Sequence, residues 1–326
     1  MKSNHGCFII SLDFELFWGV RDKKSIESYG ENIIGVWKVI PALLEAFEYY
    51  KVNATFATVG LLFGKSPEEI NKYLPLNKPN YTDANLSPYK ELDNLKSNYD
   101  YFLALELIEK ISNKGNHEIA SHTFSHYYCL EPEQTYDEFR ADIQSYIHLT
   151  KKHIIQTHSL VFPRNQINQE YLEILKEFEI TSYRGNESAW FYKPTAKADQ
   201  NKLIRFFRLI DTYINLSGYN DYDFKQINQG KPYNIPSSRF LRPYNKKWAA
   251  LDQLRLKRIC NSMTHAAKFG KVYHLWWHPH NFGSDLENNM KFLNKILQHY
   301  QMLNTKYQFQ SYTMKTLSDE LDRKQY

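Results

Sequence analysis

Short apolar runs alternate with longer amphipathic segments along most of the chain. The apolar run at 7–12 predicts a buried strand, and apolar residues between Ile34 and Phe47 then recur at helical spacing. Further strand-like runs lie at 54–59, 118–121, 159–162, 180–183 and 271–277, with a short one near Phe309, and helical segments separate most of them. This alternation predicts an α/β fold with a largely parallel sheet, and the number of units favours a barrel over an open sheet.

Two intervals break the alternation. Residues 61–98 contain four of the 12 prolines, which predicts a loop-rich insertion rather than regular barrel structure. Residues 186–243 are irregular, with strand-like pieces near 203–209, and predict a second large insertion. The chain shows no repeat or low-complexity linker, and one barrel of 326 residues is ordinary. We therefore expect a single barrel domain over 1–326 with these two insertions.

Composition and charge narrow the class of protein. The formal charge of +5 comes from 41 basic and 36 acidic residues spread along the chain, so no nucleic-acid partner is expected. Three cysteines without metal-ligand spacing favour a reducing compartment. The apolar run at 7–12 is too short for a signal peptide, and no run approaches the 18 residues of a membrane span. We expect a cytoplasmic protein without a transmembrane segment, and nothing in the sequence indicates an oligomeric state.

Chemically reactive residues follow several of the predicted strands. In barrels of this class the chemistry sits at the C-terminal ends of the strands, so residues placed there should meet at one mouth. The residues are Asp13 and Glu15 after the first strand, His122 and His126 after the third, Arg164 after the fourth, and His278 at the end of a late strand.

The carboxylates and the histidine pair suggest a metal site. Asp13 and Glu15 are two residues apart, so on an extended segment both carboxylates face the same way. His122 and His126 are four residues apart, so a helical turn after the strand would place both imidazoles on one face. Such a pair also arises by chance among 12 histidines. Two imidazoles, one carboxylate and an open position form a hydrolytic metal site, which is the interpretation that the shared barrel mouth favours.

The late histidines allow more than one interpretation. His278, as the last residue of its strand, would reach the mouth, whereas His274 is deeper and is expected to be a hydrogen-bonded core residue. His280 is expected at the rim, and a rival metal set of His278, His280 and Asp285 stays open. At the same mouth, the guanidinium of Arg164 would orient a carboxylate through a bidentate pair.

Four segments resemble the polysaccharide deacetylase family, also called the NodB-homology or carbohydrate esterase family 4 group. They are Ser-Leu-Asp-Phe-Glu at 11–15, Ala-Thr-Phe-Ala-Thr-Val-Gly at 54–60, Ser-His-Thr-Phe-Ser-His at 121–126 and His-Pro at 278–279. The resemblance covers most of the chain in the right order. It implies a distorted (β/α)7 barrel and a divalent metal used to hydrolyse N- or O-acetyl groups of sugars.

The resemblance also implies roles for individual residues. The family's first motif commonly has two adjacent aspartates, but here Phe14 separates Asp13 from Glu15, which is similar to an Asp-x-Glu branch of the family. This implies that Asp13 is the base and Glu15 a metal ligand, with an exchange of the two roles left open. The family's Arg-x-Pro-x-Gly segment has only Phe-Pro-Arg-Asn-Gln at 162–166 as its counterpart, and no aspartate-tryptophan segment is found that would orient His278.

The expected activity is metal-assisted removal of acetyl groups from a sugar or glycan precursor, in surface polysaccharide metabolism. Glu15, His122 and His126 would bind a divalent ion, with Zn²⁺ as the first choice and Co²⁺, Mn²⁺ or Ni²⁺ as alternatives. Asp13 would deprotonate a water, His278 would protonate the leaving group, and Arg164 would hold Asp13. Two alternatives stay open: a deformylase-type C–N hydrolase acting on a small molecule, and a non-catalytic carbohydrate-binding relative.

Overall fold

The computed structural model describes residues 5–193 and 202–324. At its centre is a nine-stranded sheet in which every pairing between named strands is parallel. The strands are β1 (Cys7–Phe14), β2 (Thr55–Thr58), β3 (Glu118–Ser121), β4 (Ser159–Leu160), β5 (Ser182–Gly185), β6 (Tyr233–Pro236), β7 (Arg239–Phe240), β8 (Val272–Trp277) and β9 (Gln310–Tyr312).

Strands β6 and β7 close this sheet into a barrel. The strand order is β6-β5-β4-β3-β2-β1-β8-β7, so β6 lies beside β5 and β7 lies beside β8. Only Ser237 and Ser238 separate β6 from β7. The Ser237 amide donates to the Gly185 carbonyl (2.9 Å) and the Ser238 amide donates to the His274 carbonyl (2.7 Å). With β6 and β7 taken as one bent strand, the eight strands of this order form seven positions around the barrel, while β9 pairs with β1 outside it. The predicted distorted (β/α)7 barrel is confirmed.

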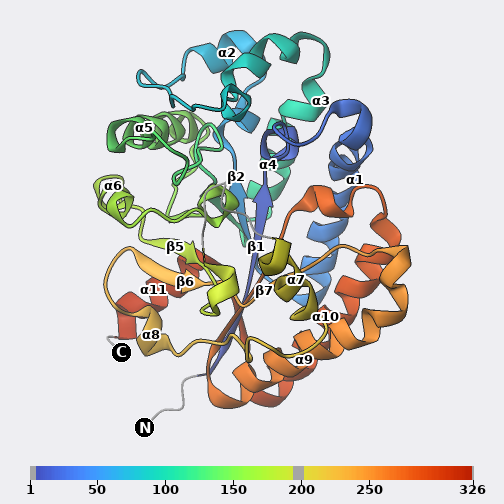
Figure 1. Ribbon diagram of the computed structural model, residues 1–326. Coiled ribbons are helices and arrows are strands. Elements are labelled where there is room, and N and C mark those ends of the chain that lie inside the picture. The colour runs from blue at the N-terminus through green and yellow to red at the C-terminus, as the bar shows by residue number, and fades with distance from the viewer. Residues whose placement is uncertain (1–4, 194–201, 325–326) are drawn as a thin grey trace.

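Helices surround the sheet (Figure 1). None of the helices in the described ranges is long and apolar enough to cross a membrane. The helices are α1 (Ile26–Tyr50), α2 (Pro67–Asn71), α3 (Tyr99–Phe102), α4 (Leu105–Ser112), α5 (Tyr136–Lys152), α6 (Leu172–Glu177), α7 (Lys202–Ile210), α8 (Phe224–Ile227), α9 (Asp252–Phe269), α10 (Leu286–Tyr307) and α11 (Met314–Lys324).

The side chains of β1 alternate between two apolar clusters, because successive side chains of a strand point to opposite faces. Phe8 and Leu12 join the large cluster that includes the buried faces of α1 and α10. Cys7 and Ile9 join the smaller cluster with Ala57 and Ala120 of the neighbouring strands. The odd-numbered positions therefore face the barrel interior, and by this parity Asp13 in the same strand does so too.

Helix α1 is built to pack closely against the segment that follows β8. It begins with a capping box in which Ser25 and Ser28 each accept from the other's amide, and such caps stabilise a helix start by about 1 kcal/mol. Gly35 permits the close approach, since a Cβ at this position would lie 2.3 Å from the Gly283 carbonyl oxygen. Asn32 completes the contact by donating to the His280 carbonyl at 3.2 Å.

The two predicted insertions differ in structure. Residues 61–98 contain α2 and several 3-10 segments and no named strand, as the prolines suggested. Residues 186–243 contain β6 and β7, so part of this interval belongs to the barrel. The strand expected near 203–209 is wrong, because these residues form helix α7. The division of the chain into one domain stays a prediction.

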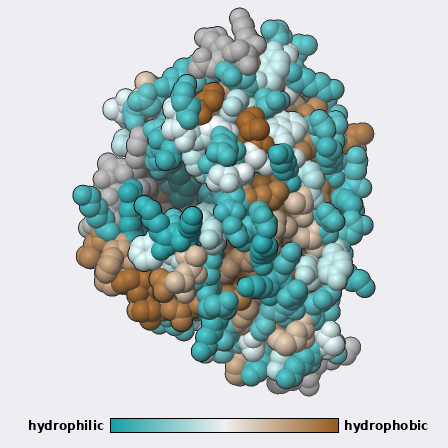
Figure 2. Space-filling view, turned by 90° about the vertical axis from the view of Figure 1, so that its right-hand side faces the viewer, coloured by the Kyte–Doolittle hydropathy of each residue, from teal (hydrophilic) through white to brown (hydrophobic). Residues whose placement is uncertain are grey.

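The molecular surface is mostly hydrophilic on the face shown in Figure 2, with one larger hydrophobic patch toward the lower left. Across the described residues, the exposed large hydrophobic side chains include Trp190, Leu203, Phe206 and Trp248.

Candidate active site

The ends of three strands bring five of the six predicted site residues together. Asp13 lies near the end of β1 and Glu15 directly follows this strand, while His122 follows β3 and His278 follows β8. His126 lies four residues beyond His122, in the loop after β3. Four of the five side chains are buried, and that of His278 is 24% exposed. His278 is thus the member of the group that a substrate can reach most easily.

The loop between the two histidines is not the helical turn that the spacing suggested. Residues 122–126 form bends, and the φ angles of Thr123 and His126 are 61° and 57°. Residues other than glycine rarely adopt this left-handed conformation, so contacts elsewhere must hold the loop in place.

Asp142 in α5 supplies these contacts. Its carboxylate accepts hydrogen bonds from the amides of Phe124 (2.6 Å) and Ser125 (3.1 Å) and from the Ser125 hydroxyl. Burial raises the pKa of Asp142 to about 7, although these hydrogen bonds oppose the shift. No sequence pattern indicates this role, since Asp142 stands among the apolar residues of an amphipathic helix.

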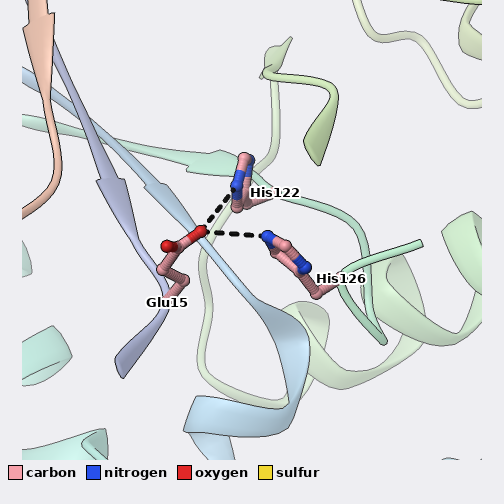
Figure 3. A group of neighbouring side chains, drawn as sticks. All are labelled: Glu15, His122 and His126. Carbon is pink, nitrogen blue, oxygen red and sulfur yellow. Dashed lines mark hydrogen bonds and ion pairs between the residues drawn. The ribbon is translucent and has the colours of Figure 1, made fainter. Parts of the chain in front are cut away.

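Glu15 faces both histidines, and the three side chains point toward one another from the end of β1 and from the loop after β3 (Figure 3). Its Oε2 atom is 2.9 Å from His126 Nε2 and 3.3 Å from His122 Nε2. One ligand atom from each of these residues can therefore reach a common point, as a metal site requires.

The hydrogen bonding of His122 favours a cation at that point. Its Nδ1 atom is 2.8 Å from the Val161 carbonyl oxygen, which can only accept, so Nδ1 carries the proton. The Nε2 atom of the neutral ring then presents a lone pair toward the Glu15 carboxylate, and it is buried without a hydrogen-bond partner. A lone pair facing a buried carboxylate is stabilised by a proton or a metal ion between them. Two imidazoles and one carboxylate form a common ligand set for hydrolytic zinc, so these residues fit a divalent ion.

Burial and charge shift the pKa values of this group. Burial by itself would raise the pKa of Glu15, but the charge of His278 and the contact with His126 hold it well below its usual range. Burial lowers the pKa of His126 to about 3, with Glu15 opposing the shift. A carboxylate beside a neutral imidazole is the protonation state in which both can bind a metal.

Asp13 is held by Arg184, which lies in β5. The Nη1 and Nη2 atoms of Arg184 donate to Oδ1 and Oδ2 of Asp13 at 2.6 and 2.8 Å. Arg184 also donates to Asn165 at 2.8 Å, and its guanidinium lies 4.1 Å from the centre of the Trp276 ring. Burial would raise the pKa of Asp13, but the nearby positive charge, mainly that of Arg184, lowers it below its ordinary value.

The expected pairing of Arg164 with Asp13 is therefore wrong. Arg164 donates to Asp22 at 2.5 Å, lies 3.8 Å from Glu131, and its guanidinium stacks 4.0 Å from the centre of the Tyr128 ring. Sequence analysis missed Arg184, although the rule on strand ends could have found it. Arg184 directly follows the predicted strand at 180–183, and therefore lies at the same mouth as the other residues.

His278 faces both carboxylates from the other side. Its Nε2 atom is 3.7 Å from Asp13 Oδ2 and 3.6 Å from Glu15 Oε1. Asn281 donates from Nδ2 to His278 Nδ1 at 3.3 Å, and its Oδ1 accepts from the Tyr29 hydroxyl at 3.4 Å. This arrangement leaves the proton of a neutral His278 on Nε2, which faces the site. Asn281 thus orients His278, a role for which the sequence had offered no candidate.

His280 was expected at the rim of the barrel mouth, but its side chain is buried at the centre of the site. Its Nε2 atom is 3.1 Å from Glu15 Oε1, and its Nδ1 atom is 2.9 Å from the Tyr29 hydroxyl. Glu15, His278 and His280 accordingly form a second group that could hold a metal ion. The rival set predicted from the sequence had Asp285 as its third member, which is wrong. Asp285 caps α10 by accepting from the Asn288 amide at 3.2 Å.

His274 lies deeper in the barrel, as predicted. Its Nε2 atom is 2.8 Å from the Ser11 hydroxyl, and the side chain is fully buried. Burial, with the charge of Arg184 added, lowers the pKa of His274 to about 3. A neutral histidine at this depth serves the packing of the barrel interior.

The structure thus combines a parallel barrel with a carboxylate–histidine cluster at the C-terminal ends of its strands. A sequence model described as polysaccharide deacetylase matches residues 34–183. Over this segment, which is 150 of the 326 residues, the chain resembles the polysaccharide deacetylase family. No curated protein matches the sequence significantly.

Solved structures share the fold at low sequence identity. A proposed polysaccharide deacetylase from Mycobacterium smegmatis is 11% identical with a TM-score of 0.61, and the match covers 100% of this chain and 93% of that chain. The allantoinase Puue is 8% identical with a TM-score of 0.54, covering 98% and 91%. The 4-alpha-glucanotransferase from Thermococcus litoralis is 11% identical with a TM-score of 0.52, covering 97% and 40%. At these identities the likeness shows the fold alone.

Proposed function

We propose that the protein is a metal-dependent hydrolase that removes acetyl groups from an N- or O-acetylated sugar or glycan precursor. The observation that carries the proposal is the arrangement around Glu15. Its carboxylate faces His122 and His126 on one side, while His278 lies between Glu15 and Asp13 on the other. The match of residues 34–183 to the polysaccharide deacetylase family supports an acetylated carbohydrate as the substrate.

Glu15, His122 and His126 would hold the divalent ion, with Zn²⁺ as the first choice for two imidazoles and one carboxylate. When bound, the ion supplies Lewis acidity for the water and for the acetyl carbonyl oxygen. The Val161 carbonyl fixes the ring of His122 so that Nε2 faces the site.

Asp13 is the proposed base. Arg184 occupies one lone pair on each of its oxygens and lowers its pKa, and a carboxylate oxygen has a second lone pair that can accept the proton of a water. The water oxygen forms a bond to the acetyl carbon as its proton moves to Asp13.

His278 is the proposed acid. The bond from the acetyl carbon to the sugar nitrogen or oxygen breaks, and His278 gives the proton on Nε2 to the departing atom, so that acetate and a free amine or hydroxyl are released. Its partial exposure and its place opposite Asp13 suit this role.

The test is acetate release from a panel of N- and O-acetylated sugars, with Zn²⁺, Co²⁺, Mn²⁺ or Ni²⁺ added. His278→Ala should lower kcat by about 10²- to 10⁴-fold, the usual contribution of a general acid, while metal content stays unchanged. Loss of the metal in His278→Ala would instead assign the ion to the group of Glu15, His278 and His280. Release of formate or ammonia in place of acetate would favour a different C–N hydrolase, and sugar binding without any product would refute the catalytic proposal.

A further inference from the structure

A cavity of about 220 Å³ lies beside the candidate active site. Phe240 and Trp276 form part of its wall, and the centres of their rings are 5.8 and 5.6 Å from that of His278. Asn165, another residue of the wall, accepts the hydrogen bond from Arg184 described above. Because the cavity and the candidate catalytic residues share these neighbours, one substrate molecule can occupy both.

The wall of this cavity is strongly basic. It carries five basic side chains and one acidic side chain, that of Glu187. Glu187 is buried, and burial raises the pKa of its carboxyl group, with the charges of Arg239 and Arg184 opposing the shift. The basic residues are Arg164, Lys193, Arg208, Arg239 and Arg242.

Two of the arginines have carboxylate partners. Arg239 Nη2 lies 3.1 Å from Asp211 Oδ2, and Arg164 Nη2 lies 2.5 Å from Asp22 Oδ2. The charges of these two guanidinium groups are therefore at least partly balanced inside the protein.

Arg208 and Arg242 form no ion pair with a carboxylate among the described residues, although the charge of Glu187 acts on Arg208. Arg208 donates from Nε to the Phe191 carbonyl at 2.5 Å, and Arg242 donates from Nε to the Thr212 hydroxyl at 2.9 Å, both neutral acceptors. Burial lowers the pKa of both guanidinium groups, with Tyr192 opposing the shift. A partly buried cation without a counter-ion is costly, so both positions favour the arrival of an anion.

We propose that this cavity binds an oxyanion group, a phosphate ester or a carboxylate, carried by the acetylated sugar substrate. Planar guanidinium groups bind both kinds of oxyanion through paired hydrogen bonds. The cavity is smaller than the roughly 300–1,000 Å³ of pockets that enclose a whole ligand, so it accommodates one anionic group and not a polymer. The inference rests on the proposed function, since it names the substrate class of the same site.

The first experiment is titration calorimetry of the metal-loaded protein with inorganic phosphate. The Arg208→Gln/Arg242→Gln double variant should bind phosphate at least about tenfold more weakly, because charge-assisted hydrogen bonds are lost. Arg242→Lys, which keeps the charge, should recover part of the affinity. Arg140→Gln is the matched control, because Arg140 pairs with Glu177 on the exposed surface and should leave binding unchanged. Arg242→Gln alone repeats the test if the double variant does not fold. Equal affinity in wild type and the folded variants would overturn the proposal, as would phosphate binding that also falls in Arg140→Gln.

The second experiment compares acetate release from a neutral acetamido sugar, its phosphate ester and its uronic acid. KM should be at least tenfold lower for one of the two anionic sugars than for the neutral sugar, and the better one identifies the oxyanion. The advantage should disappear in Arg242→Gln with kcat little changed. If acetate is released equally well from all three, the proposed function stands and the anion site fails. If phosphate binds through Arg208 and Arg242 but no sugar releases acetate, the anion site stands and the deacetylase function fails.

Discussion

Replacement of Arg184 should abolish most of the activity, because the buried charge of Asp13 would lose its partner. The two side chains are 0% and 4% exposed and are joined by two charged hydrogen bonds. Removing one partner of a buried ion pair costs about 3–5 kcal/mol, because the other charge is left unpaired. Since burial favours the protonated form of Asp13, this energy must then be supplied to ionise the base. At about 1.4 kcal/mol per tenfold change, Arg184→Gln should lower kcat/KM by about 10²- to 4 × 10³-fold.

The assay is kcat/KM for acetate release between pH 5 and 9, with metal content and melting temperature measured on each variant. The acidic limb of the Arg184→Gln profile should move to higher pH, and Arg184→Lys should lie between Gln and wild type because it keeps the charge without the two-pronged geometry. Arg164→Gln leaves the pair with Asp13 intact, so its loss should be at least tenfold smaller. The surface variant Arg140→Gln serves as the control. Equal losses in Arg164→Gln and Arg184→Gln, or an unshifted acidic limb in Arg184→Gln, would refute the reasoning.

Three further predictions concern the metal, the loop and helix α1. Glu15→Gln should lose bound metal, as measured by elemental analysis, whereas Asp13→Asn should keep the metal and lose turnover; the reverse result would exchange their roles. The pKa of Asp142 rises from 3.8 to about 7 on folding, so its contribution to the free energy of unfolding is complete below about pH 4 and is lost as the pH rises through 7. About 3 kcal/mol of this contribution is lost between pH 5 and pH 8. Asp142→Asn should therefore show a smaller decrease in melting temperature between these pH values than wild type, and an identical decrease would contradict the assignment. Gly35→Ala should cost about 1–3 kcal/mol of stability by pushing α1 away from the segment after β8, and should lower kcat, whereas the exposed Glu31→Ala in the same helix should do neither.

The sequence predicted the parts of the site that follow from strand order. Asp13, Glu15, His122 and His278 could be placed together because each lies at the end of an apolar run and parallel strands end at one mouth. Arg184 and Asp13 are 171 residues apart, and nothing local in the sequence indicates that β5 aims its side chain at β1. Such partners depend on which face of each strand is turned inward, and a one-residue change in register would reverse it.

The errors in the fold come from short elements. β6 and β7 have four and two residues, too few for a period of two to be visible, and together they bend at Ser237 to pair with different neighbours. The segment of helix α7 resembles a strand in composition because it is rich in aliphatic and aromatic residues. Arg205 and Arg208 lie three residues apart in it, which is helical spacing and was the better guide.

The geometry also bears on the division of roles between Asp13 and Glu15, which the sequence left open. Both oxygens of Asp13 are engaged by Arg184, a cation that would repel a metal ion placed against the same carboxylate. Both oxygens of Glu15 instead face imidazole nitrogens, Oε2 toward His126 and Oε1 toward His280. An ion bound at Glu15 therefore gains neutral nitrogen ligands without meeting a guanidinium. This difference in surroundings favours Glu15 as the ligand and Asp13 as the base.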